Sequence, residues 1–315
     1  MDSAAHKGMK TRLCSMIVIF ALLCMVFGIA GAEEKPDVIC VSYLGPEGTY
    51  TQEAAQFFFT DGEALIPRET VGLSIEDLLS GRSDYAVIPQ ENTVGGPVAN
   101  YLDALISAEG VYVVGEVVIP ISQTLMGVPG AALDGIRTVC SHAQGLVQSA
   151  QWREEHLSGA AVMEMPSTAA AASYVAEQRD QSIAAVAAPG AAALYGLEVL
   201  AENVQITDAN KTRFYVLSRV PLDGEGWTRA AFIVTCGADR IDDIIVAVHQ
   251  TGLELVALHD RPEGSALGEY HFIVECERPE GVTDEQIAAV GSMDGVRFLG
   301  CFHAAEKRAG TEEIP

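Results

Sequence analysis

Short β-branched runs alternate with segments of helical apolar spacing along most of this 315-residue chain. One round of the alternation extends from residue 38 to residue 119, and a second round begins at Arg137. Strands that alternate with helices are typical of parallel sheets covered by helices on both faces. The sequence therefore predicts an α/β protein with two lobes, each a mainly parallel sheet flanked by helices, and a cleft between the lobes.

The pattern changes beyond an acidic, glycine-rich break at residues 221–227, which we interpret as a domain boundary. The order after the break is strand, helix, strand, strand, helix and strand, which is the ferredoxin-like βαββαβ order. We therefore predict a two-lobed main domain over residues 37–220, a second domain over 229–304 and a polar tail over 305–315.

The first 32 residues have the pattern of an export signal. Basic residues at positions 7, 10 and 12 precede 20 uncharged residues, and this run ends in Ala-Gly-Ala at 30–32. We predict a signal peptide over residues 1–32, cleaved after about Ala32, and an exported protein in the periplasm or outside the cell. The alternative is a membrane anchor, since an uncleaved run of this length can span a bilayer.

The charge balance and the cysteines exclude several classes of function. The chain has 19 Lys and Arg against 43 Asp and Glu, a formal net charge of −24. Such a surface repels phosphate backbones, so we expect no nucleic-acid partner. The scattered cysteines and histidines lack metal-ligand spacing, so we predict no metal and no cofactor, while one disulfide is left open. An anionic substrate would need a local pocket that is cationic or rich in N–H groups.

Four polar clusters follow predicted strands, the position at which open α/β sheets bind ligands. The clusters are Gly45–Thr51, Pro89–Gly96, Ser141–Gln148 and Asn210–Phe214. In the first cluster, glycines and the N–H groups of the next helix are suited to binding an anion. An ordinary strand–helix turn without a ligand, with Thr49 as the helix N-cap, fits the same residues. Ser141 is expected to cap a single helix over 143–156.

The fourth cluster places a threonine beside an arginine, at Thr212 and Arg213. An arginine can hold a carboxylate with two parallel hydrogen bonds while the threonine hydroxyl donates another. The alternative is an ordinary surface charge next to a strand.

Taken in order, these segments resemble the prephenate dehydratase family. The motifs are YLGPEGTYTQEAA at 43–55, IPQENTVGGPV at 88–98, SHAQGLVQSA at 141–150, STAAAA at 167–172 and YGLEVLAENVQITDANKTRFYVL at 195–217. The resemblance implies a periplasmic-binding-protein-like dehydratase domain followed by an ACT regulatory domain. It also implies conversion of prephenate, the small-molecule partner, to phenylpyruvate in L-phenylalanine biosynthesis, and a homodimer or higher homo-oligomer.

The same resemblance assigns roles to individual residues. Thr212 is implied to be catalytic, as the hydroxyl donor to the leaving group, and Arg213 to hold a substrate carboxylate. Thr49 and the adjacent N–H groups are implied to cradle the pyruvyl carboxylate. The full set of substrate-binding candidates is Thr49, Glu91, Asn92, Ser141, Gln148 and Arg213.

An L-phenylalanine effector would bind in the C-terminal domain, where the candidate residues are Arg261 and Leu253. The family's Glu-Ser-Arg-Pro segment appears here as His-Asp-Arg-Pro at 259–262. This change puts regulation by phenylalanine in doubt, although the domain is still expected to dimerise. Two further functions stay open: arogenate dehydratase, which forms L-phenylalanine from L-arogenate, and an exported solute-binding protein without turnover. A third is an amino-acid-sensing module that works through the βαββαβ domain over 229–304.

Overall fold

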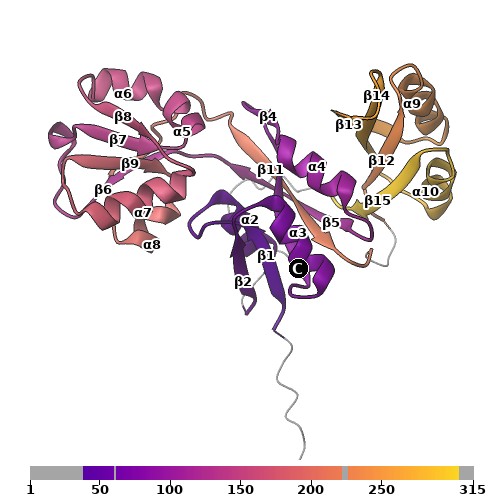
Figure 1. Cartoon of the computed structure of the whole chain (residues 1–315), viewed down its shortest axis with the longest axis horizontal. Coiled ribbons are helices and arrows are strands. Elements are labelled where there is room, and N and C mark those ends of the chain that lie inside the picture. Colours follow the sequence, from indigo (N-terminus) through magenta and orange to yellow (C-terminus); the bar gives the residue numbers. More distant parts are fainter. Residues whose placement is uncertain (1–37, 60–61, 222–225, 305–315) are drawn as a thin grey trace, which may run out of the picture. The chain divides into compact units, whose positions relative to one another are not determined.

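The computed structural model describes residues 38–59, 62–221 and 226–304. The predicted signal peptide and the polar tail lie outside these ranges. The described residues from Ile39 to Ala304 belong to one compact unit, which contains three β-sheets (Figure 1). Within the described ranges, no helix is both long and apolar enough to cross a membrane.

The first sheet has the strand order β2-β1-β3-β11-β5, with the short β4 paired to β3. Its strands are β1 (Cys40–Leu44), β2 (Ala64–Arg68), β3 (Tyr85–Asn92), β4 (Gly96–Pro97), β5 (Tyr112–Pro120) and β11 (Lys211–Ser218). Helix α2 (Tyr50–Phe58) covers one face, and helices α3 (Val71–Ser80) and α4 (Ala99–Ser107) cover the other.

The second sheet has the order β10-β6-β9-β7-β8. Its strands are β6 (Thr124–Gly127), β7 (Thr138–Ser141), β8 (Ala161–Glu164), β9 (Ile183–Ala187) and β10 (Glu198–Ala201). Its helices are η1 (Leu133–Gly135), α5 (Ala143–Gln148), α6 (Ala150–His156), α7 (Thr168–Gln178) and α8 (Gly190–Tyr195). Figure 1 shows α7 and α8 on one side of this sheet and α6 on the other, which agrees with its two separate apolar cores.

Both sheets are mixed rather than mainly parallel, which corrects the prediction while the α/β class is confirmed. Strand β11 pairs antiparallel with both of its neighbours, β3 and β5. Likewise, β6 pairs antiparallel with β9 and β10. In the first sheet the reason lies in the path of the chain, which leaves this sheet after β5, builds the second sheet, and returns to insert β11 in the opposite direction.

One local prediction also needs correction. The single helix expected over 143–156 is interrupted at Ser149, whose hydroxyl donates to the carbonyl oxygen of Gly145 at 2.7 Å. A serine that bonds back to the preceding turn bends a helix. In addition, the sequence patterns did not indicate β2, α3, β6 or β10. Strand β2 contains Pro67, which a sheet tolerates here because β2 is an edge strand.

The third sheet follows with strand order β13-β14-β12-β15, all antiparallel. Its elements are, in chain order, β12 (Arg229–Gly237), α9 (Ile241–Gln250), β13 (Glu254–Pro262), β14 (Glu269–Glu277), α10 (Asp284–Gly291) and β15 (Val296–Phe302). The five cysteines among the described residues are free thiols.

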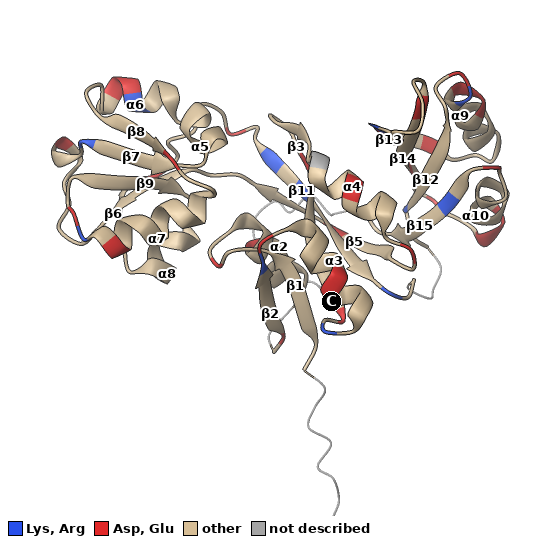
Figure 2. Cartoon of the chain, in the orientation of Figure 1, with Lys and Arg blue, Asp and Glu red and all other residues tan. Residues whose placement is uncertain are grey.

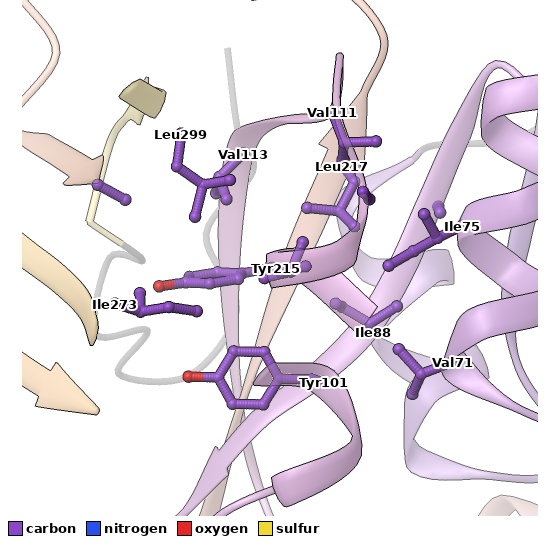
Figure 3. Close-up of a cluster of buried hydrophobic side chains, with 14 of the residues drawn as sticks. Val71, Ile75, Ile88, Tyr101, Val111, Val113, Tyr215, Leu217, Ile273 and Leu299 are labelled. Atoms are coloured by element: carbon purple, nitrogen blue, oxygen red, sulfur yellow. The ribbon is translucent and has the colours of Figure 1, made fainter. Parts of the chain in front are cut away.

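One apolar core joins the first and third sheets. Tyr101 of α4 and Tyr215 of β11 pack in it with Ile273 of β14 and Leu299 of β15. Figure 3 shows the two tyrosine hydroxyls directed to the side on which Ile273 lies. Close approach of the sheets requires Gly300, because a Cβ there would lie 2.2 Å from a carbonyl oxygen of β5.

Candidate active site

A cavity of about 250 Å³ is lined by residues from the first and the second sheet. The first sheet contributes the β1–α2 turn, the end of β3 and the start of β11. The second sheet contributes α5 and the N-terminus of α7, and the β5–β6 connection adds Ile121 and Gln123. The polar lining residues are Thr49, Tyr50, Thr51, Asn92, Gln123, His142, Gln144, Gln148, Ser167, Thr168 and Thr212.

Thr212 and Asn92 form a hydrogen-bonded pair in this cavity. The Nδ2 of Asn92 donates to Thr212 Oγ1 at 2.9 Å and to Asn210 Oδ1 at 2.8 Å. The Oδ1 of Asn92 accepts from Gln144 Nε2 at 3.1 Å. Since Thr212 Oγ1 accepts the bond from Asn92 and is not seen to donate one within the described residues, its proton is available to a bound molecule.

A β-bulge brings Asn92 to the cavity side. In the ladder between β11 and β3, Thr212 pairs with Asn92 and Arg213 with Glu91, but Phe214 pairs with Pro89. One residue of β3, Gln90, is therefore extra, and strict alternation of side chains is broken there. Without the bulge, the side chain of Asn92 would point to the opposite face.

Two helix N-termini meet the cavity from different sheets. The side chain of Thr49 caps α2 by accepting from the N–H of Gln52, and its hydroxyl donates to Leu44 O. The side chain of Ser167 caps α7 by accepting from the N–H of Ala170 at 2.9 Å. The first N–H groups of each helix have no carbonyl partner within the helix, and together with the helix dipole they favour anions.

The lining lacks formal charge. Of the described residues that line the cavity, none is Lys, Arg, Asp or Glu. Figure 2 shows acidic segments on helices around all three sheets and few basic ones, with a basic segment on β11. The sequence led us to expect a pocket that is either cationic or rich in N–H groups. The described lining is not cationic, so the N–H groups remain as the means of attracting an anion.

Arg213 lies outside this cavity, which corrects its expected contact with a substrate carboxylate. Adjacent residues of a strand point to opposite faces, so Arg213 cannot share the direction of Thr212. Its guanidinium instead pairs with Glu91, Glu116 and Glu275. Burial opposes this charge, but attraction from Glu275 and then Glu116 holds the pKa of Arg213 above its ordinary value. Glu91 is likewise directed away from the cavity, toward Arg213.

Ser141 is also absent from the cavity lining. Its side chain is fully buried, and its hydroxyl donates to Val186 O of the neighbouring strand at 2.6 Å. The cap of α5 is His142, whose Nδ1 accepts from the N–H of Gln144 at 3.3 Å. Ser141 therefore stabilises the second sheet, and the predicted N-cap moves by one residue.

Gln123 is a lining residue that the sequence motifs did not indicate. It is 3% exposed, and its Nε2 donates to Gln148 Oε1 at 3.0 Å. The other end of its amide, Oε1, is buried without a hydrogen-bond partner in the described structure. The signal that could have identified it is its place just after a long β-type run, where ligand sites of α/β sheets occur.

Of the two effector candidates, Arg261 lies on β13 of the third sheet and Leu253 directly precedes that strand, and both are outside the cavity. Leu253 is 1% exposed and packs in the core of that sheet. Arg261 of β13 forms two hydrogen bonds to Asp103 of α4, at 2.6 and 2.8 Å. Arg261 therefore already has a carboxylate partner within the chain.

Comparison with known proteins gives a consistent picture. A family model described as prephenate dehydratase matches residues 41–221. A prephenate dehydratase of Amycolatopsis methanolica is 34% identical over 282 residues, which cover 87% of this chain and 91% of that protein. A chloroplastic arogenate dehydratase of Arabidopsis thaliana is 37% identical over 194 residues, 62% of this chain and 45% of that protein.

Solved structures with a similar fold agree with these relatives. A prephenate dehydratase from Arthrobacter aurescens, solved in complex with L-Phe, has a TM-score of 0.77 at 29% identity and covers 87% of this chain and 92% of its own. A second structure, described as GqqA, a novel type of quorum quenching acylases, has a TM-score of 0.73 at 27% identity, with 84% and 98% covered.

Proposed function

The chain belongs to the prephenate dehydratase family, and on that premise we propose how its own residues perform the reaction. The enzyme is a lyase that removes the ring hydroxyl of prephenate as water and the ring carboxylate as CO₂. Aromatisation of the ring drives the reaction, so no covalent intermediate is needed. The protein has to hold a dianion and protonate the departing oxygen.

Thr212 is the proposed donor to that oxygen. The observation that supports this role is its bond with Asn92, which occupies the acceptor side of the hydroxyl and leaves the proton to the cavity. Asn92 is itself fixed by Asn210 and by Gln144. A hydroxyl held in this way is already oriented before the substrate binds, which lowers the cost of reaching the transition state.

The two substrate carboxylates are proposed to bind at the N-termini of α2 and α7. These ends offer the first N–H groups of each helix, at Tyr50 and Thr51 and at Thr168. A helix N-terminus attracts an anion by about 0.3–1 kcal/mol, and more where it is partly buried. Helix α2 packs on the first sheet and α7 on the second. A dianion bound between their N-termini therefore contacts the helices of both sheets at once.

The uncharged lining favours prephenate over arogenate. The side chain of arogenate bears an ammonium group, and the described lining residues offer it no Asp or Glu. Losing hydrogen bonds to a charged group costs about 1.5–3 kcal/mol, which corresponds to roughly 10- to 150-fold. We therefore expect kcat/KM for prephenate to exceed that for arogenate by this factor.

The test is an assay of phenylpyruvate formation by the protein without the predicted signal peptide, residues 1–32. The key variant is Thr212→Val. Valine keeps the shape but removes the proton donor, so kcat should fall about 100-fold or more while KM stays within about threefold. Thr235→Val changes an exposed threonine of β12 and is the matched control, with no expected effect. Full turnover by Thr212→Val would remove Thr212 from the mechanism.

A second assay, with an acyl-amide substrate, distinguishes prephenate dehydration from the acylase activity named for the GqqA structure. An acylase that works by covalent catalysis needs an activated hydroxyl or thiol, often one bonded to a histidine. Among the described cavity residues, no hydroxyl is hydrogen-bonded to a histidine; His142 accepts from a backbone N–H. We expect turnover of prephenate and none of an acyl-amide substrate. The reverse result would contradict the proposal.

The third sheet is proposed to be an ACT-like regulatory domain over residues 229–304, following a two-lobed dehydratase domain over 37–220. The βαββαβ order of its elements and the Arthrobacter complex with L-Phe support this assignment. Titration of activity with L-phenylalanine tests it, and sedimentation tests the proposed homodimer.

Export with cleavage after about Ala32 is proposed from the sequence alone and is tested by mass spectrometry of the secreted protein.

A further inference from the structure

The face of β11 opposite the cavity presents Arg213 to carboxylates from three different strands. Its Nη2 lies 2.6 Å from Glu275 Oε2 and 2.5 Å from Glu116 Oε2, and its Nη1 lies 3.2 Å from Glu91 Oε2. Glu91 and Glu116 belong to the first sheet, whereas Glu275 belongs to β14 of the third sheet. One arginine therefore connects the strand of Thr212 to its neighbours and to a separate sheet.

Glu275 is fully buried and is bound chiefly to the first sheet. Its Oε1 accepts from the hydroxyl of Tyr215 at 2.5 Å and from Gln90 Nε2 at 2.8 Å. Its Oε2 accepts from Arg213. These three donors lie on β11 and β3, the two strands whose other face forms the cavity.

We propose that Glu275 is a positioning residue for the catalytic hydroxyl, and this proposal rests on the proposed function of Thr212. Glu275 fixes Arg213, which is the neighbour of Thr212 in β11. It also fixes Gln90, the extra residue of the bulge that turns Asn92 toward the cavity. A carboxylate of the third sheet thus sets the geometry of the dehydration site without touching the substrate.

The third sheet has other attachments to the first, so Glu275 is not needed simply to hold it in place. Arg261 binds Asp103 of α4. Arg297 of β15 donates to three carbonyl oxygens at the end of α4, at 2.6, 3.0 and 3.1 Å. The apolar core in Figure 3 spans the same two sheets. Removal of the charge of Glu275 is therefore expected to leave the fold intact.

The first test compares Glu275→Gln with Glu277→Gln. An amide at position 275 places an NH₂ group against one of the donors that now bind the carboxylate. We expect kcat to fall about 10- to 100-fold, as for a displaced catalytic group, with KM within about threefold. Glu277 lies two residues along β14, is 38% exposed in its side chain and pairs with Arg229. Glu277→Gln should keep kcat within about twofold.

A double variant shows whether Glu275 acts through Thr212. If it does, Glu275→Gln should lower kcat in the wild type but have no further effect in Thr212→Val. Unchanged kcat in folded Glu275→Gln, or multiplied losses in the double variant, would overturn the proposal. Full activity of Thr212→Val alone would instead refute the proposed function.

Should Glu275→Gln fail to fold, Tyr215→Phe decides the question. This change removes one hydrogen bond to Glu275 and keeps the aromatic ring in the core. A drop in kcat of about three- to tenfold at constant KM supports the proposal, since the carboxylate would be held less firmly. Wild-type kcat in this variant would overturn it.

Discussion

Replacing Asn92 by Asp reverses the hydrogen-bonding direction of one cavity side chain at almost constant shape. In the structure, Asn92 Nδ2 donates to Thr212 and to Asn210, while Oδ1 accepts from the N–H groups of Val94 and Gly95. A carboxylate keeps the accepting role and loses both donated bonds. The hydroxyl of Thr212 then donates to the new carboxylate, and its proton no longer faces the cavity.

The magnitudes follow from these contacts. The lost bond to Asn210 leaves two oxygens facing each other, whereas the bond with Thr212 is reversed and kept, so the free energy of unfolding should fall by about 1–3 kcal/mol. Loss of the proton donor should lower kcat about 100-fold or more. The added negative charge opposes a dianionic substrate, so KM should rise as well. Below the ordinary aspartate pKa of about 3.9, a neutral acid can donate to Thr212 again. The activity of Asn92→Asp relative to wild type should therefore increase as the pH falls toward 4.

The assay is steady-state kinetics of phenylpyruvate formation between about pH 3.5 and 8, a range that includes the ordinary aspartate pKa of about 3.9. Asn100→Asp is the matched control, because Asn100 is exposed in the first turn of α4 and the change adds the same charge outside the cavity. Wild-type kcat for Asn92→Asp near pH 8, with the control also unaffected, would refute the assigned direction of the Thr212 hydroxyl.

Two further predictions concern stability and substrate capture. Gly300 has a φ of 144°, and a methyl group there would lie 2.2 Å from Val113 O, so Gly300→Ala should lower the free energy of unfolding by about 1–3 kcal/mol. Urea unfolding measures this, and an unchanged midpoint would contradict the close contact of β15 with β5. The net charge of −24 should slow capture of an anionic substrate, so kcat/KM should rise as the ionic strength increases from about 0.01 to 0.15 M. A decrease with salt would point to a local cationic site instead.

The motifs identified residues of the cavity, but they did not give the direction of each side chain. Thr212, Asn92 and Gln148 line one cavity. The alternation rule places Arg213 on the other face from Thr212 once both are known to lie in β11, but the sequence patterns placed this pair beside a strand and not within one. The bulge is different, because strict alternation puts Glu91 on the cavity face and nothing in the local pattern signals the extra residue.

Local sequence patterns also could not predict which strands pair with one another. Strand β11 follows the second sheet in the sequence but lies between β3 and β5 of the first. A period of two indicates a strand and its faces, yet it is the same for parallel and antiparallel neighbours. The helix break at Ser149 could not be predicted for a related reason. A serine is compatible with an unbroken helix, and the sequence does not show that its hydroxyl bonds to the carbonyl oxygen of Gly145.

The position of β11 makes the three sheets depend on one another at the active site. Its N-terminal end continues from the second sheet, its cavity face presents Thr212, and its other face presents Arg213 and Tyr215 to Glu275 of the third sheet. A fragment ending at residue 221 would keep the family motifs but would leave these two polar side chains without their buried acceptor. It would also expose to water the apolar face that the first sheet shares with the third. Because β11 would lose these hydrogen bonds and the apolar packing on this face, the strand of Thr212 would be less firmly held in such a fragment. We therefore infer that the proposed dehydration site depends on all three sheets, although only the first two line it.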